Sequence, residues 1–169
     1  MLGTAVADDD LVHLRQLPGL QVLNLDKTRI TNAGLLHLSG LTGLHSLILN
    51  DTGVTDDGLK ELQRLTELHD LFLDNMQVTD AGLAHLHALT ALQHLTLRNT
   101  PVSDAGLAHL KTLTRLQWLV LDNTEVSDAG LVHLKTLPNL EVLLLRRTHV
   151  TDSGIAELKH AVPLLAIHK

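Results

Sequence analysis

The sequence predicts an α/β solenoid, a stack of similar strand–helix units, and three observations lead to this fold class. Leucine recurs at fixed intervals from Leu11 to Leu165. The intervals repeat with a period of 24 residues along the chain. Aromatic residues are nearly absent, with one Phe, one Trp and no Tyr. We therefore expect a core that forms by stacking one aliphatic side chain from unit to unit.

The period defines the predicted domain organisation. Aligning the chain on the pattern LxxLxL brings one leucine of each unit into a single column: Leu20, Leu44, Leu68, Leu92, Leu116 and Leu140. We predict one domain over residues 1–169, with a partial repeat and then full repeats and a terminal partial strand: 1–19, 20–43, 44–67, 68–91, 92–115, 116–139, 140–163 and 164–169.

Each unit begins with a predicted strand. The repeat that starts at Leu92 opens with LQHLTL, which alternates apolar and variable residues. This alternation is typical of a strand with one buried face. We therefore expect Leu95 and Leu97 to point inward and His94, Thr96 and Arg98 to point outward.

A turn follows the strand and carries a threonine in most units: Thr28, Thr52, Thr100, Thr124 and Thr148. The hydroxyl of this residue can satisfy backbone groups as the chain leaves the strand. Met76 replaces the threonine in one unit. Because a thioether has no hydroxyl to donate, we expect a local irregularity at Met76.

The second half of each unit is a predicted short helix. It starts at V-[ST]-D-A-G-L, where Ser103 or Asp104 can cap the helix. An aspartate column lies where the helix dipole favours negative charge: Asp56, Asp80, Asp104, Asp128 and Asp152. Leu107, Leu110 and Leu113 follow at spacings of three, which places them on one inward face.

The repeat resembles the leucine-rich repeat family, LxxLxLxx(N/C/T)x(L/V), and in particular the bacterial 24-residue type with TDAGLxHLxxL, which is related to the cysteine-containing class of F-box receptors. The resemblance covers nearly the whole chain. It implies a right-handed curved solenoid with a parallel sheet on the concave face and short helices on the convex face, used in most members for protein recognition. Departures from the pattern are Met76, Asp10 in place of a glycine, and Glu61 and Glu157 in a histidine column.

Charge and composition restrict the partners. The formal net charge is −6 with no long run of either sign, so we expect neither nucleic acid nor an anionic membrane as a partner. The opening MLGTAVADDD lacks the features of a signal peptide, and no apolar run reaches membrane-spanning length. A cytoplasmic chain is the default expectation, with an unprotected N-terminal edge and a natural C-terminal end.

No catalytic motif is evident, so we expect neither an enzyme nor a bound cofactor. The sequence has no GxSxG, and Ser103 and Ser127 stand in for threonine at helix starts. Gly82 and Gly106 begin helices without GxGxxG or P-loop spacing. Cysteine is absent, which excludes disulfides and thiolate chemistry.

A histidine column offers a metal-binding alternative: His13, His37, His85, His109 and His133. Successive turns of a stacked sheet lie about 5 Å apart, so adjacent imidazoles can share a metal ion. The competing interpretation is that the residue is simply copied with the repeat. No carboxylate column lies beside the histidine column to orient the imidazole rings.

The predicted concave face differs from the scaffold because its residues vary. Both aromatic residues, Phe72 and Trp118, fall on this face. We predict a partner-binding site of apolar residues with charged neighbours: Ile48, Phe72, Trp118, Val120 and Leu144, flanked by Asp74, Arg98, Asp122 and Arg146. The alternative is that strand-forming residues fill an exposed sheet through propensity alone.

These features favour a non-enzymatic recognition module or scaffold that binds a protein or peptide on its concave face. Two alternatives remain open. One is a structural element that self-associates end to end through uncapped solenoid ends. The other is a histidine-rich surface that binds metal.

Overall fold

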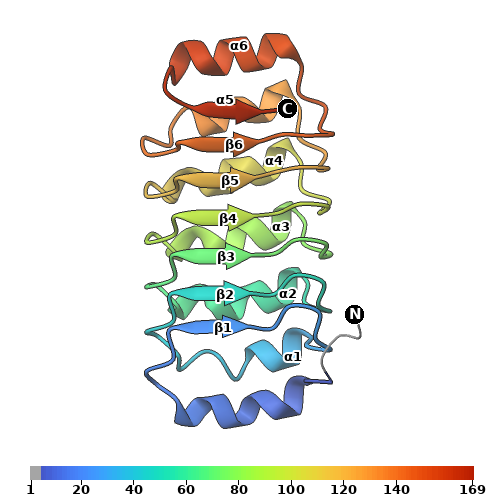
Figure 1. Cartoon of the computed structure of the whole chain (residues 1–169), viewed down its shortest axis with the longest axis vertical. Coiled ribbons are helices and arrows are strands. Elements are labelled where there is room, and N and C mark those ends of the chain that lie inside the picture. The colour runs from blue at the N-terminus through green and yellow to red at the C-terminus, as the bar shows by residue number, and fades with distance from the viewer. Residues whose placement is uncertain (1–4) are drawn as a thin grey trace.

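The computed structural model describes residues 5–169 as one stack, to which each repeat adds a strand and a helical segment (Figure 1). Seven strands form a parallel sheet in chain order. Each strand pairs with the strand of the next repeat, so that Leu71 lies opposite Leu95 and Leu95 opposite Leu119. This confirms the predicted solenoid; residues 1–4 of the predicted first partial repeat lie outside the described part.

The elements recur with the 24-residue period. The strands are β1 (Val22–Asn24), β2 (Ser46–Ile48), β3 (Asp70–Phe72), β4 (His94–Thr96), β5 (Trp118–Val120), β6 (Val142–Leu144) and β7 (Ala166–His168). The α-helices are α1 (Asn32–Leu35), α2 (Asp56–Leu59), α3 (Asp80–Leu83), α4 (Asp104–Leu107), α5 (Asp128–Leu134) and α6 (Asp152–Ala161). The 3₁₀ helices are η1 (Asp8–Gln16), η2 (Lys60–Arg64), η3 (Ala84–Ala88) and η4 (Ala108–Thr112).

The helical half of three inner repeats is mostly a 3₁₀ helix. In the fourth repeat, α4 is a four-residue helix and η4 continues it for five residues. Leu107, Leu110 and Leu113 are spaced by three and are all fully buried. A spacing of three matches a helix of three residues per turn, in which such side chains eclipse on one face.

The core lies between the sheet and the helical row. The middle residue of each inner strand points into it, as Leu95 of β4 does with no exposed surface, and so does Leu97 directly after that strand. Met76 also belongs to this core and is 1 % exposed. The expected irregularity at Met76 is absent from the backbone, since Asn75 has the same left-handed φ of about 60° as its counterparts. The flexible thioether fills apolar space instead.

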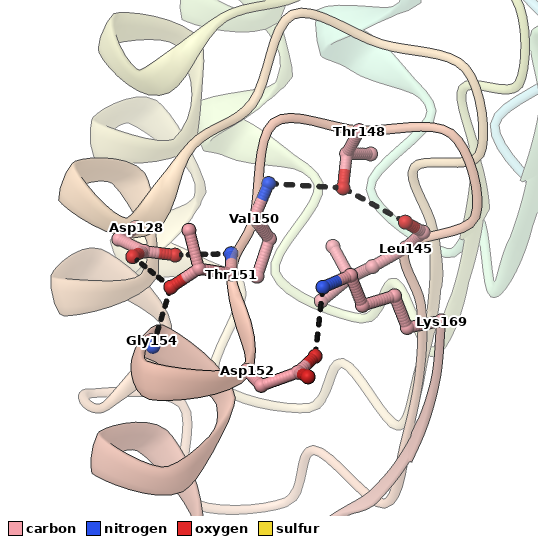
Figure 2. Close-up of polar contacts among 8 residues, drawn as sticks. All are labelled: Asp128, Leu145, Thr148, Val150, Thr151, Asp152, Gly154 and Lys169. Carbon is pink, nitrogen blue, oxygen red and sulfur yellow. Dashed lines mark hydrogen bonds and ion pairs between the residues drawn. The ribbon is translucent and has the colours of Figure 1, made fainter.

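The turn after each strand is held by the threonine hydroxyl, as predicted. Each hydroxyl donates to the carbonyl three residues earlier at 2.6–2.8 Å, and Thr148 donates to Leu145 (Figure 2). The residue before the threonine or Met76 has a left-handed backbone: Lys27, Asp51, Asn75, Asn99, Asn123 and Arg147. Asparagine and aspartate tolerate this conformation better than other side chains, which explains four of the six.

A second set of contacts joins each repeat to the next, and we call it the latch row. Asp128 at the start of α5 accepts from the backbone N–H of Thr151 at 2.8 Å and from its hydroxyl at 2.6 Å (Figure 2). The Thr151 hydroxyl in turn accepts from the N–H of Gly154 in α6. The same pairs recur along the stack: Asp8–Thr31, Asn32–Thr55, Asp56–Thr79, Asp80–Ser103 and Asp104–Ser127.

The helix-start glycines belong to the same arrangement. A Cβ added at Gly130 would collide with a carboxylate oxygen of Asp104 and lie in tight contact with the Cα of that residue. The glycine therefore makes room for the latch aspartate of the preceding repeat. In η1, Asp10 occupies the position that these glycines have in later repeats. Among the described residues, no aspartate of an earlier repeat packs there. The Asp10 carboxylate accepts from the N–H of Ala7 at 2.9 Å.

The last turn has a different partner for its latch residue. Asp152 is paired with Lys169 Nζ at 2.8 Å, and its side chain is 95 % exposed (Figure 2). Leu164, in the loop between α6 and β7, is 96 % exposed. Within residues 5–169, no helix is both long and apolar enough to cross a membrane.

Candidate functional site

One face of the seven-stranded sheet is left uncovered by the helices, and we call it the sheet face (Figure 1). The middle residue of each strand points to the core, so the first and third residues point to the sheet face. Phe72 and Trp118 are therefore both on this face, as predicted. Trp118 is 43 % exposed and Phe72 is half-buried.

The two aromatic rings border a shallow hollow of about 290 Å³, which we call the aromatic hollow. Its lining is Phe72, His94, Thr96 and Trp118. Phe72 lies opposite Thr96 in the sheet register, and His94 lies opposite Trp118. The rings thus stand diagonally, two strands and two residues apart, which corresponds to about 12 Å between their Cα atoms. His94 and Thr96, both on β4, lie between the two aromatic residues.

Two polar groups lie in the aromatic hollow. His94 Nδ1 is 2.6 Å from Asp70 Oδ1 on the neighbouring strand. This contact orients the imidazole ring through Nδ1. The Thr96 hydroxyl is buried and has no hydrogen-bond partner among the described residues. A buried hydroxyl without a hydrogen-bond partner lowers the stability of the fold. This unpaired hydroxyl belongs to one of the residues that line the aromatic hollow.

The remaining predicted apolar residues lie in the same row of the sheet as Phe72 and Thr96, outside the lining of the hollow. Ile48 and Leu144 are half-buried on the sheet face. Val120 was expected to face solvent but is only 4 % exposed, flanked by Thr96 and Leu144 in the register. Val120 therefore packs between its neighbours on the sheet face and presents little exposed surface.

The four predicted charged residues form a row at the end of the strands, but half of them are used internally. Asp74 accepts from the backbone N–H of Arg98, and Asp122 accepts from that of Arg146, both at 2.8 Å. Asp122 is 7 % exposed and forms an ion pair with Arg98 at 3.3 Å. Arg98 and Asp122 therefore neutralise each other, whereas the side chains of Asp74 and Arg146 form no ion pair among residues 5–169.

The histidine column does not assemble a metal site in the described structure. Across residues 5–169, no three or more His, Asp or Glu side chains are grouped so that they could hold a metal ion. His87 Nδ1 lies 2.9 Å from the carbonyl of Ala84. A stacked histidine pair lies outside the column, where the ring centroids of His45 and His69 are 5.0 Å apart.

The stacked parallel strands, the short helices and the uncovered sheet face together define a leucine-rich repeat solenoid. The family profile described as "Leucine Rich repeat" matches residues 41–62. None of the curated proteins compared with the chain matches it significantly.

Several solved structures share the fold. An internalin, inlF, from Listeria monocytogenes has a TM-score of 0.71 at 22% identity, over 95% of this chain and 50% of that one. Internalin C2 from the same organism has a TM-score of 0.70 at 28% identity, over 92% and 73%. A leucine-rich repeat protein from Leptospira interrogans has a TM-score of 0.62 at 18% identity, over 94% and 51%. The chain thus spans about half the length of inlF.

Proposed function

We propose that the chain is a non-enzymatic recognition module or scaffold that binds a protein or peptide on its sheet face. One observation carries this proposal. The single Trp and the single Phe of the whole chain line the same hollow. A protein that builds its core from aliphatic residues has no packing need for exposed aromatics, whereas binding energy at interfaces is concentrated in such residues.

The proposed site is centred on Phe72 and Trp118 and comprises the predicted set: Ile48, Phe72, Asp74, Arg98, Trp118, Val120, Asp122, Leu144 and Arg146. The resemblance to leucine-rich repeat proteins supports a protein partner. The His94–Asp70 pair does not argue for catalysis, because the neighbouring Thr96 hydroxyl makes no hydrogen bond to His94 and is therefore not activated as a nucleophile.

End-to-end self-association is a weaker second candidate. The exposed Leu164 and the open edge of β7 favour it. A head-to-tail continuation of the 24-residue stack, however, would bring Asp152 of one copy against Asp10 of the next, where inner repeats have glycine. Two carboxylates would then repel. The backbone N–H of Ala7, which the incoming Asp152 would need, is already bonded to Asp10.

The experiment that tests the proposal uses the wild-type chain to select peptides from a random display library. Selected peptides are then titrated by calorimetry into wild type and into the Phe72→Ala/Trp118→Ala double variant. We expect a loss of at least about 2 kcal/mol, or roughly 30-fold in affinity. Val132→Ala removes an equally exposed apolar side chain from α5 and should leave binding unchanged. Equal binding by wild type and double variant would place the site elsewhere, and a mass that rises with concentration would favour self-association.

A further inference from the structure

A second hollow, which we call the arginine hollow, lies at the carboxyl ends of β4, β5 and β6. It has a volume of about 400 Å³, and its lining contains only polar residues: Arg98, Asn99, Asp122, Asn123, Arg146 and Arg147. Three arginines and one aspartate give the lining a formal charge of +3 − 1 = +2. The whole chain has a net charge of −6, so this hollow reverses the sign of the surrounding protein.

The repeat period explains why the arginines converge. Arg98, Asp122 and Arg146 occupy the same position of successive repeats, and Asn99, Asn123 and Arg147 occupy the next position. The second group has left-handed backbones, with φ of 55–57°. Arg147 adopts this conformation without the local hydrogen bonding that asparagine offers, so a charged side chain stands where the scaffold favours asparagine.

The positive charge is only partly neutralised by the protein itself. Asp122 uses one oxygen for the Arg98 guanidinium and the other for the N–H of Arg146. The guanidinium groups of Arg146 and Arg147 form no hydrogen bond or ion pair with any of residues 5–169. Asp74 is the next carboxylate along the row, but it is outside the lining and accepts from the Arg98 backbone. Two guanidinium groups are thus available to an incoming anion.

The arginine hollow lies beyond the aromatic hollow in the direction of the strands. Arg98 comes two residues after Thr96, the last residue of β4, and Asp122 comes four residues after Trp118, the first residue of β5. At about 3.3 Å per residue, the two hollows are separated by roughly 10 Å, which is the span of three residues of extended chain. One continuous segment can therefore reach both.

We propose that the arginine hollow binds acidic side chains of the same protein segment whose apolar side chain enters the aromatic hollow. The recognised element is then an extended peptide with an apolar residue and, about three residues away, Asp or Glu. Guanidinium groups bind carboxylates in a bidentate geometry, and the amide of Asn123 adds a further donor, whereas the Asn99 amide already donates to Asn75. This inference rests on the proposed recognition function and specifies the chemistry of its partner.

The test uses designed peptides of glycine and serine that contain one leucine and a Glu-Glu pair, placed one to six residues apart. Matched peptides carry Gln-Gln or Lys-Lys instead. Because Trp118 is the only tryptophan of the chain, its fluorescence reports directly on the aromatic hollow. We expect the Glu peptides to bind at least tenfold more tightly than the Gln peptides, with the best spacing near three residues. This preference should decrease as ionic strength rises.

The variant Arg146→Gln/Arg147→Gln should abolish the preference for Glu while the dependence on leucine remains. Arg64→Gln/Arg115→Gln removes two exposed arginines outside both hollows and should preserve it. Equal binding of Glu, Gln and Lys peptides would overturn the acidic subsite and leave the recognition face standing. If Glu-dependent binding is instead unaffected by loss of the peptide's leucine and by the Phe72→Ala variant, the aromatic hollow is not the centre of the site.

Two further outcomes also decide the inference. Inorganic phosphate that displaces the Glu peptide at constant ionic strength, and binds alone with similar affinity, would make this a site for a free anion and overturn the peptide assignment. If no peptide binds at millimolar concentration, both the acidic subsite and peptide recognition on this face are wrong. Circular dichroism of each variant confirms that the fold is intact before binding is compared.

Discussion

The latch row and the sheet face obey the same 24-residue period but differ in how strictly the residue type repeats. In the latch row, Asp or Asn occupies every turn from Asp8 to Asp152. In the inner turns, its side-chain oxygen accepts from the backbone N–H of a Thr or Ser in the next turn. On the sheet face, the row that contains Trp118 also contains Val22, Ser46, Asp70, His94 and Val142.

The difference follows from what each row contacts. A latch side chain satisfies a backbone donor and a hydroxyl of the next repeat, so its chemistry is constrained at every turn. A sheet-face side chain points away from the core and from the neighbouring backbone, so the fold tolerates almost any residue there. Variation within a repeat protein therefore indicates the surface on which a partner can act.

The strongest test of this difference uses neighbouring residues of one strand, Leu119 and Trp118. Leu119 points into the core and has no exposed surface, so Leu119→Ala should cost about 2–5 kcal/mol of unfolding free energy. Trp118→Ala removes a larger side chain that is 43 % exposed, and should cost about 1 kcal/mol or less. Urea denaturation measures both. If Trp118→Ala is as damaging as Leu119→Ala, the ring serves the scaffold, and the proposed site loses its main support.

A second test breaks one latch. Asp104→Ala removes the acceptor for the N–H and the hydroxyl of Ser127, and we expect a loss of about 2–3 kcal/mol because hydrogen bonds to a charged group are involved. Asp104→Asn should cost much less, because Asn32 bonds to the same two groups of Thr55: its Oδ1 accepts from the backbone N–H, and its Nδ2 donates to the hydroxyl. Equal losses for the alanine and asparagine variants would show that charge near the helix start, rather than hydrogen bonding, stabilises the row.

A third test concerns the space that the latch requires. Gly130→Ala forces a Cβ against the side chain and backbone of Asp104, and should cost about 1–3 kcal/mol. Gly40→Ala is the control, because nothing lies within 4 Å of a Cβ at that position. It should be neutral or slightly stabilising, since alanine restricts the unfolded chain. A harmless Gly130→Ala, measured by thermal unfolding, would mean that the aspartate moves aside easily.

The sequence predicts most of the fold because periodicity is a local signal repeated many times. The alternation in LQHLTL places Leu95 and Leu97 inward, and the structure agrees. The hydroxyl of Thr148 was assigned to the backbone of its own turn, and it bonds there. The helical half was less predictable, since a leucine spacing of three fits both an α-helix face and the observed 3₁₀ helix.

Contacts between repeats were harder to predict. Ser103 and Asp104 were alternative helix caps in the sequence; Ser103 is the cap, and Asp104 bonds to Ser127 of the next repeat. The alignment predicts which residues occupy equivalent positions in successive repeats. It does not predict which position of one repeat contacts which position of the next. Burial on the sheet face is similarly a property of neighbours, which is why Asp122 is enclosed although its row points outward. Arg147 was missed as a site residue, although its place beside Arg146 at the end of a strand would have indicated the arginine hollow.

The smallest expected effect is a change in the pKa of Asp128 within the latch row. The hydroxyl of Thr151, and then its backbone N–H, donate to this carboxylate and lower its pKa below the usual value of 3.8, with Lys169 contributing less. Since the folded-state pKa is depressed, the stabilisation from this group is present above the usual value and is lost as pH falls through the folded-state pKa. Thr151→Val removes the larger cause, so the pKa should rise toward 3.8 but not reach it, because the backbone N–H remains. Carboxyl ¹³C chemical shifts followed from pH 6 to pH 2, which spans the usual aspartate range, measure this directly.

The control for this variant is Thr136→Val. The hydroxyl of Thr136 bonds to the carbonyl of His133 rather than to a carboxylate, so its removal should leave the pKa of Asp128 unchanged. An unchanged pKa in Thr151→Val would mean that the hydroxyl contributes nothing to the latch in solution, and that the backbone N–H alone holds one repeat to the next at this position.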